Sequence, residues 1–170
     1  PGIEMAGELY DKKQYFLPQL LRAAETMKTA FAIIKPLLSA ETEQTAGIIV
    51  LATVEGDIHD IGKNIVAVML ENYGFKIIDL GKDVKAADIV DAAEREGADI
   101  IGLSALMTTT MPKMKEVIEL LQARELKCKV MVGGAVLTEE YARSLGADGY
   151  SRDAREAVKT ARILSGQGGN

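Results

Sequence analysis

The sequence predicts an α/β fold, built on a five-stranded, doubly wound parallel sheet and preceded by a helical segment. Short apolar runs alternate with stretches of helical periodicity from residue 47 onward. More than ten residues separate successive runs, which is the spacing that parallel strands require. The first forty residues differ, because apolar side chains recur there every three or four positions over more than five turns.

These first forty residues are expected to form a short helix and then a long amphipathic helix. The short helix is indicated by the spacing of Ile3, Ala6, Gly7 and Tyr10. The apolar face of the long helix comprises Leu17, Leu20, Leu21, Ala24, Met27, Phe31, Ile34 and Leu38. Two helices cannot bury both apolar faces on each other, so they need further helices, the sheet domain, a ligand or another chain.

The sheet domain begins with a strand over 47–54, a nearly continuous apolar run typical of a strand covered on both faces. A helix over 62–73 follows and stops at Gly74. The remaining strands are predicted over 75–80, 99–103, 127–132 and 148–150. The remaining helices are predicted over 86–96, 112–124, 138–145 and 154–164. Right-handed crossovers in this order predict a flavodoxin-like, and in that sense Rossmann-like, arrangement.

The composition excludes several classes of protein. The chain has 170 residues, of which 48% are hydrophobic and 26% charged, with a formal net charge of −5. This describes a globular chain with a core and argues against a nucleic-acid binder that relies on a basic surface. No apolar stretch approaches a membrane span and no signal-peptide pattern is present, so no membrane partner and a cytoplasmic location are expected. The single histidine, His59, excludes a two-histidine metal site, and the single cysteine, Cys128, excludes an internal disulfide.

The first candidate site follows the first strand, where residues 55–64 read EGDIHDIGKN. Ligands of open parallel sheets bind beyond the carboxyl ends of the strands. His59 lies in that loop, two residues after Asp57. A neutral imidazole is a good metal ligand when its other nitrogen donates to a carboxylate, and a single histidine can supply one axial position to a metal held by a macrocycle. A solvated loop histidine is the alternative interpretation.

Two further loops belong to the same predicted edge. Residues 104–110 contain four hydroxyl side chains, which turn and cap chemistry would explain equally well. Gly133 and Gly134 follow the fourth strand, as a tight turn or as room for an elongated ligand. The glycines form neither a dinucleotide fingerprint nor a P-loop. The third strand ends in Ser104 rather than Asp, which disfavours a phospho-acceptor receiver domain.

Together these residues resemble the cobalamin-binding modules of corrinoid-dependent methyltransferases, whose motifs are D-x-H-x-x-G, then S-x-L, then G-G. The matching segments are 57–62, 104–106 and 133–134, in the same order, spacing and strand placement. The resemblance implies cobalamin bound base-off/His-on, with His59 as the lower axial ligand of cobalt. Asp57 would hydrogen-bond to His59. Thr110 would complete the triad at a position where close relatives carry Ser.

The same resemblance implies contacts with the rest of the cofactor. Ser104 and Thr108 would contact the displaced dimethylbenzimidazole base, and the two glycines would line the channel for the nucleotide tail. Tyr150 and Ala154 match positions at the far end of that channel. The full set of cofactor-binding residues in this interpretation is Gly56, Asp57, Ile58, His59, Asp60, Gly62, Ser104, Leu106, Thr108, Gly133, Gly134, Tyr150, Ala154, Tyr10, Leu17 and Leu20.

The first forty residues resemble the later half of the helical cap of methionine synthase and related corrinoid proteins, most tellingly at 16–20, which read FLPQL. Tyr10, Leu17 and Leu20 match cap positions that cover the upper corrin face. The family cap has four helices and this chain supplies about two. Either the chain is a fragment, or another copy completes the cap by self-association. The expected division is a partial cap over 1–40, a linker over 41–46 and a cobalamin-binding domain over 47–170.

The function implied by the resemblance is that of a methyl carrier. Cobalamin, alternating between cob(I)alamin and methylcobalamin, would take a methyl group from a donor and pass it to an acceptor thiol. Methionine synthase is the favoured reading, which implies folate and homocysteine modules and a reductive activation partner, and the chain alone would not be catalytically complete. The alternative is a stand-alone corrinoid protein of a methanol, methylamine or methoxy-aromatic system. A mutase normally lacks cap helices, and a photosensor cap is rich in aromatic residues, whereas this chain has no Trp.

Overall fold

The computed structural model describes residues 45–167 without a gap, together with scattered positions in the first 44 residues. Those positions are 5, 9, 12–16, 18–19, 22–23, 25–26, 29–30 and 33. The chain divides into two compact units, residues 1–43 and 44–170. In the part of the chain that is described, no helix combines the length and apolarity needed to cross a membrane.

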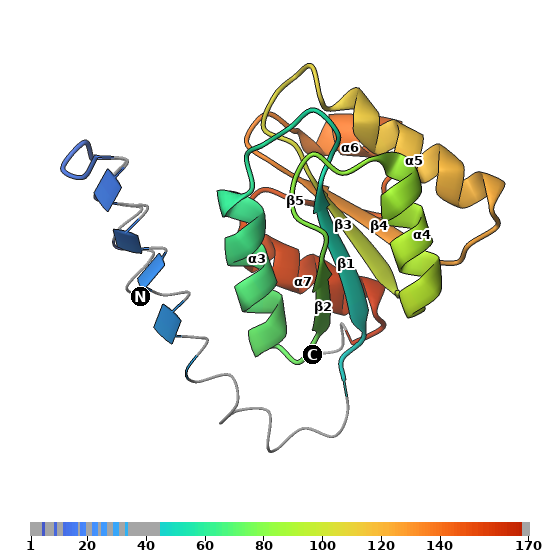
Figure 1. The fold of residues 1–170 in the computed structure, drawn as a ribbon, viewed down its shortest axis with the longest axis horizontal. Helices are drawn as coiled ribbons and strands as arrows, with labels where there is room; N and C mark the ends of the chain where they lie inside the picture. The colour runs from blue at the N-terminus through green and yellow to red at the C-terminus, as the bar shows by residue number, and fades with distance from the viewer. Residues whose placement is uncertain are drawn as a thin grey trace. The chain divides into compact units, whose positions relative to one another are not determined.

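The second unit contains a parallel sheet with the strand order β2-β1-β3-β4-β5 (Figure 1). Its strands are β1 (Ile48–Thr53), β2 (Lys76–Asp79), β3 (Ile100–Ser104), β4 (Lys129–Gly133) and β5 (Gly149–Ser151). Every pairing between neighbouring strands is parallel. This order confirms the predicted flavodoxin-like topology, in which the chain reverses direction across the sheet after β2.

Helices cover both faces of the sheet (Figure 1). They are α3 (Ile61–Asn72), α4 (Ala86–Glu96), α5 (Pro112–Ala123), α6 (Glu139–Leu145) and α7 (Ala154–Leu164). One core cluster joins the sheet to α3 and α7, through Ile49, Leu51, Leu70, Ile100 and Val158 among others. A larger cluster joins the opposite face to α4, α5 and α6. Burying both faces explains why the strands read as continuous apolar runs.

The element boundaries follow the sequence signals closely. The helices α4 and α6 end at Gly97 and Gly146, whose φ angles of 62° and 82° are left-handed, a conformation that glycine adopts readily at the end of a helix. Helix α7 begins after Asp153, whose carboxylate accepts hydrogen bonds from the amides of Arg155 and Glu156. The strand β4 begins at Lys129 rather than at the predicted residue 127, because the Lys129 amide makes the first hydrogen bond to the neighbouring strand end, at Asp99.

The described positions of the first unit agree with a helical reading. Those between residues 18 and 33 have helical backbone, as do positions 5 and 9. Residues 12 and 13 form a turn, and the amides of Gln14 and Tyr15 donate to the carbonyl of Leu9, at 2.8 and 3.0 Å. The predicted cap residues Tyr10, Leu17 and Leu20 lie outside the described residues, so their contribution stays a prediction.

Candidate cobalamin site

The three sequence motifs lie at the carboxyl edge of the sheet. Thr53, Ser104, Gly133 and Ser151 occupy one row of the strand register, each at the end of its strand. The loops that follow β1, β3 and β4 therefore start side by side. This is the convergence that parallel strands predict for motifs placed after successive strands.

Asp57 connects two of these loops. Its side chain is fully buried. Oδ1 accepts a hydrogen bond from the His59 amide at 3.0 Å and lies 2.8 Å from Nδ1 of His59. Oδ2 accepts hydrogen bonds from the amides of Leu106 and Met107, at 2.7 and 3.2 Å, and from the Thr110 hydroxyl at 2.8 Å. One carboxylate thus holds the loop after β1 against the loop after β3.

The same contacts set the charge of this carboxylate. Burial by itself raises the pKa of Asp57, but the hydrogen bonds from the His59 and Leu106 amides and from the His59 and Thr110 side chains outweigh it. The net effect holds the pKa of Asp57 well below its ordinary range. The ionised carboxylate can only accept hydrogen bonds, so in the neutral imidazole of His59 the proton is on Nδ1 and the lone pair is on Nε2.

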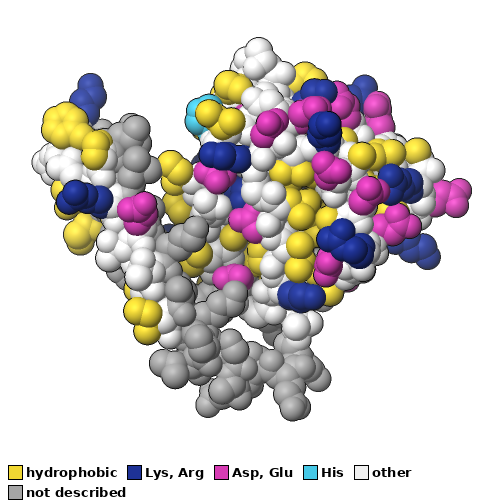
Figure 2. Space-filling view, in the orientation of Figure 1, with side chains coloured by type: hydrophobic (Ala, Val, Ile, Leu, Met, Phe, Trp, Pro, Cys, Tyr) yellow, Lys and Arg dark blue, Asp and Glu magenta, His cyan; other side chains and the backbone are white. Residues whose placement is uncertain are grey.

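The imidazole of His59 is directed toward solvent. The side chain is 46% exposed, and Nε2 has no hydrogen-bond partner among the residues that the structure describes. Figure 2 shows this side chain, in cyan, at the surface next to apolar side chains. Ile58, Ile61 and Leu106 are exposed large hydrophobic residues of the flanking loops and of α3. An oriented imidazole beside an exposed apolar surface suits a metal that is carried by a large, flat organic ligand.

A metal held by protein side chains alone does not fit this site. Within the described part of the chain, no group of three or more His, Cys, Asp or Glu residues could hold a metal ion. The histidine can contribute one ligand, and the remaining ligands have to come with the metal. A corrin supplies them, so the donor set fits cobalamin.

On the sheet face that packs under α3 and α7, the side chains become smaller toward the carboxyl edge. The amino half of this face carries the large side chains of Ile49, Leu51, Ile100 and Met131. The last row, at the carboxyl edge, carries only small or hydroxyl residues, namely Thr53, Ser104, Gly133 and Ser151, and the row before it on this face places Gly102 and Gly149 beside Leu51 and Met131. A Cβ at Gly133 would lie 2.9 Å from the Ser151 carbonyl oxygen, so that position requires glycine. This composition fits the predicted passage for the nucleotide tail, which stays a prediction.

A different structural reason requires glycine at position 134. Its φ of 141° is unfavourable for other residues, and a Cβ there would overlap the carbonyl oxygen of Ala105. The Ala105 amide in turn donates to the carbonyl of Gly133 at 3.2 Å. The glycine pair therefore lets the loop after β4 touch the loop after β3.

The other predicted residues are distributed around this edge. Thr108 is exposed and Ser104 is half-buried, while Gly62 lies in the first turn of α3 with open space around it. Ala154 is the first residue of α7. Tyr150 differs from its neighbours in β5, because its hydroxyl donates to the Leu137 carbonyl at 3.0 Å and its side chain packs with the core under α4, α5 and α6. Its side chain thus faces away from the row that contains Ser104 and Gly133.

Three residues that contribute to the structure of this site were not predicted from the sequence. The Met107 amide donates to Asp57, which no side-chain pattern can reveal. Lys63, in the first turn of α3, is buried and pairs with Asp79 at the end of β2. Asp83, in the loop after β2, accepts a hydrogen bond from the Gly56 amide at 2.7 Å. Lys63, the only basic residue of α3, was the one available signal.

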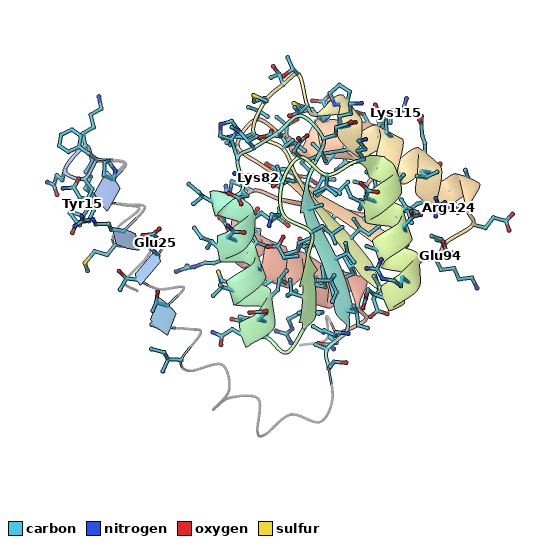
Figure 3. All side chains as sticks on the ribbon, in the orientation of Figure 1. Tyr15, Glu25, Lys82, Glu94, Lys115 and Arg124 are labelled. Carbon is cyan, nitrogen blue, oxygen red and sulfur yellow. The ribbon has the colours of Figure 1, made fainter. Side chains whose placement is uncertain are left out.

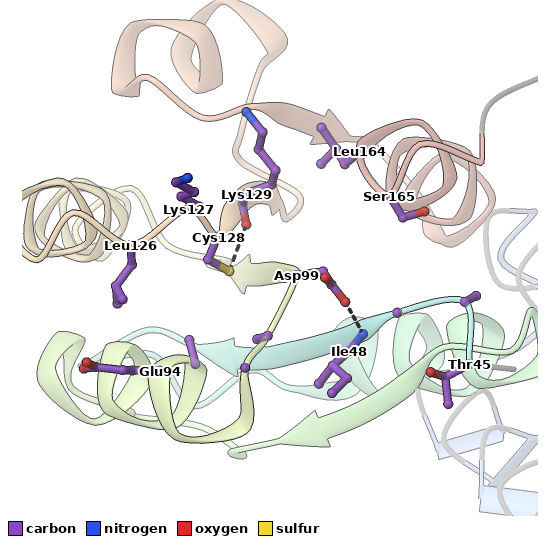
Figure 4. Close-up of a pocket in the computed structure, with 15 residues that line it drawn as sticks. Thr45, Ile48, Glu94, Asp99, Leu126, Lys127, Cys128, Lys129, Leu164 and Ser165 are labelled. Atoms are coloured by element: carbon purple, nitrogen blue, oxygen red, sulfur yellow. Dashed lines mark hydrogen bonds between the residues drawn. The ribbon is translucent and has the colours of Figure 1, made fainter.

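A hollow of about 830 Å³ lies at the opposite, amino edge of the sheet (Figure 4). Asp99 accepts a hydrogen bond there from the Ile48 amide at 2.8 Å. Burial, followed by the charges of Asp99 and Asp148, raises the pKa of the Cys128 thiol in this hollow to about 12. These residues belong to none of the predicted motifs, and they lie away from the carboxyl edge that carries His59.

A flavodoxin-like sheet whose buried carboxylate orients an exposed histidine after β1 defines the class of cobalamin-binding proteins. The chain belongs to the B12 binding domain family, since a family model of that description matches residues 47–159. A second model, also described as a B12 binding domain, matches residues 1–35. Cobalamin is therefore the cofactor, as predicted.

Relatives narrow the class further. The chain is 45% identical over 165 residues to dimethylamine corrinoid protein 3 of Methanosarcina acetivorans, covering 96% of this chain and 78% of the relative. It is 46% identical over 171 aligned positions to a corrinoid protein of Desulfitobacterium hafniense, covering 98% of this chain and 79% of that relative. These relatives favour the alternative prediction, a stand-alone corrinoid protein, over the preferred prediction of a methionine synthase module. They do not support a role in methionine biosynthesis or partner modules for folate and homocysteine.

Solved structures agree with this placement. The monomethylamine corrinoid protein of Methanosarcina barkeri matches with a TM-score of 0.71 and 34% identity, over 96% of this chain and 78% of that one. The methanol:cobalamin methyltransferase complex of the same organism matches with a TM-score of 0.72 and 33% identity, over 96% of this chain and 63% of that one. A receiver domain from Mycobacterium tuberculosis, 18% identical with a TM-score of 0.55, shares the fold alone.

Proposed function

We propose that this chain is the corrinoid protein of a methyltransferase system and carries a methyl group for a methylamine or methanol donor. The observation that carries the proposal is the Asp57–His59 pair, in which a buried carboxylate leaves Nε2 free on a B12 binding domain. The relatives named for dimethylamine, and the solved structures named for monomethylamine and methanol, support this donor class.

Bound cobalamin supplies a cobalt atom that can accept a methyl group from a donor and give it to an acceptor thiol. The residues of the chain provide ligation and orientation. His59 offers Nε2 as the lower ligand, and Asp57 keeps the proton at Nδ1. Thr110 donates to the second oxygen of Asp57 and so holds the carboxylate in place. The exposed apolar side chains of Ile58, Ile61 and Leu106 offer contact area to a corrin.

The rest of the cofactor has proposed contacts as well. Ser104 and Thr108 are assigned to the displaced base, and Gly133 and Gly134 to the nucleotide tail. Residues 1–40 are assigned to a helical cap. The expected partners are a methyltransferase subunit that brings the donor, a second that brings the acceptor, and a reductive activation partner.

The ligand assignment is tested by reconstituting the protein with methylcobalamin. We expect the wild type to retain the corrinoid with a His-on absorption spectrum, and the His59→Ala variant to show a base-off spectrum. Lys127→Ala, an exposed change at the opposite edge of the sheet, is the control and keeps the wild-type spectrum. A wild type that retains no corrinoid, or a His59→Ala protein with an unchanged spectrum, would refute the assignment.

The donor class is tested by methylating the reduced, cobalamin-loaded protein. We expect methylation from dimethylamine, monomethylamine or methanol in the presence of the corresponding methyltransferase. Methylation from methyltetrahydrofolate alone, with none from these donors, would restore the methionine synthase reading.

A further inference from the structure

We infer that Asp83 is a positioning residue that holds the His59 loop in the geometry needed for His-on ligation. This inference rests on the proposed function, since it concerns the same histidine. Asp83 lies in the loop between β2 and α4, outside all three motifs, and its hydrogen bonds to the histidine loop reach main-chain atoms of that loop, not the imidazole or the Asp57 carboxylate. It acts on the backbone that carries them.

Two hydrogen bonds link Asp83 to the turn that precedes His59. The Gly56 amide donates to Oδ1 of Asp83 at 2.7 Å. The Asp83 amide donates to the carbonyl of Asp57 at 3.0 Å. The side chain and the backbone of one residue thus bind two successive residues of the histidine loop. The carboxylate that orients His59 belongs to the second of these residues.

The backbone conformation at Gly56 and Asp83 restricts which residues can form these two hydrogen bonds. Gly56 has a φ of 81° and Asp83 has a φ of 55°, both left-handed. Most residues avoid that region, whereas Asp and Asn tolerate it because their side chains can bond locally to the backbone. Asp83 therefore combines an acceptor of the right length with a conformation that few side chains accept.

The loop that carries Asp83 is itself anchored to the end of β1. The Thr53 amide donates to the Gly81 carbonyl at 2.9 Å, and the Val84 amide donates to the Thr53 carbonyl at 3.1 Å. Val54 and Val84 form a parallel bridge beyond the regular sheet. Asp83 lies between these contacts, so the hydrogen bonds to the end of β1 fix its position relative to the sheet.

The same segment also holds the far end of the histidine loop. Asp79 accepts a hydrogen bond from the Gly81 amide at 2.8 Å and pairs with the ammonium group of Lys63. Lys63 follows His59 by four residues and its side chain is 2% exposed. Residues 79–84 therefore contact the histidine loop at both of its ends. One contact is at Gly56, where the loop begins, and the other is at Lys63, where the loop passes into α3.

Three variants of the full chain, each loaded with methylcobalamin, test the role of Asp83. Asp83→Gly keeps the left-handed backbone and removes the acceptor, whereas Asp83→Asn keeps both. Lys82→Gly is the matched control, because the side chain of this neighbour makes no hydrogen bond or ion pair within the described structure (Figure 3). The readouts are the ratio of His-on to base-off absorbance and, in cobalamin-free protein, hydrogen exchange of the Gly56 amide.

We expect Asp83→Gly to lower the His-on to base-off ratio by about two- to tenfold, the effect of losing one hydrogen bond. Exchange of the Gly56 amide should accelerate in the same variant. Asp83→Asn and Lys82→Gly should match the wild type in both measurements. An unchanged ratio in Asp83→Gly, or an equal fall in Asp83→Asn or Lys82→Gly, would overturn the inference. A wild type with no His-on spectrum would instead refute the proposed function, while the exchange measurement would still report on Asp83.

Discussion

Oδ2 of Asp57 lies 2.8 Å from the hydroxyl oxygen of Thr110, although the two residues are 53 positions apart in the chain. Thr110 is buried and its hydroxyl also lies 2.9 Å from the Met107 carbonyl, so it is held within the loop after β3. If that loop moves, the Asp57 carboxylate and the His59 imidazole that it orients are therefore expected to move with it.

The hydrogen bonds to Asp57 make stability depend on pH. Because the pKa of Asp57 is lowered in the folded protein, its contribution is present above the ordinary carboxyl range, around 4, and is lost as the pH falls toward the folded pKa. We expect the free energy of unfolding, measured in urea, to decline below about pH 5. Asp57→Asn should cost about 1–3 kcal/mol at pH 7 and flatten that decline. An equally steep decline in the variant would contradict this origin.

The close approach of two loops at Gly134 predicts a strong effect of adding one methyl group. Gly134→Ala should destabilise the protein by about 2–4 kcal/mol, because it combines an unfavourable φ with overlap of the Ala105 carbonyl. Gly146→Ala is the matched control, since Gly146 also has positive φ but has nothing within 4 Å of an added Cβ. It should cost about 1 kcal/mol. Equal losses in thermal unfolding would show that the overlap is relieved at no cost.

The buried ion pair predicts unequal effects of removing its two partners. The Lys63 side chain is 2% exposed, whereas that of Asp79 is 35% exposed. Asp79→Ala leaves a buried ammonium group without its counter-charge and should cost about 2–4 kcal/mol. Lys63→Met leaves a carboxylate that water can still reach and should cost less than about 1 kcal/mol. The double variant should be more stable than Asp79→Ala alone in denaturant unfolding, and the reverse order would contradict this reasoning.

Cys128 is expected to be unreactive in the folded protein. Burial and the nearby charges of Asp99 and Asp148 raise the pKa of its thiol to about 12, so very little thiolate is present at pH 8. We expect labelling by a thiol reagent at pH 8 to be about a hundredfold slower in the native protein than in urea. Similar rates in both conditions would show that the thiol is accessible and ordinary.

Much of the fold could be predicted from local patterns. The predicted helix over 154–164 has the boundaries that the structure shows, and the structure adds that the Asp153 carboxylate caps its first turn. The start of β4 was misplaced by two residues, since hydrophobicity does not reveal where the first sheet hydrogen bond forms. The resemblance to cobalamin-binding modules assigned Tyr150 to the far end of the cofactor channel. Its side chain faces the other side of the sheet, because successive residues of a strand alternate between faces.

Periodicity and short spacing are enough to predict the parallel sheet, the carboxyl edge that carries the motifs, and the pairing of His59 with Asp57, which needs only two residues of separation. Three other features appear only when the chain is folded: the remaining donors to Asp57, the hydrogen bond from the Gly56 amide to Asp83, and the burial of Lys63 against Asp79. Each of these depends on distances between residues far apart in the chain, which are set when the loops pack and which no local pattern encodes.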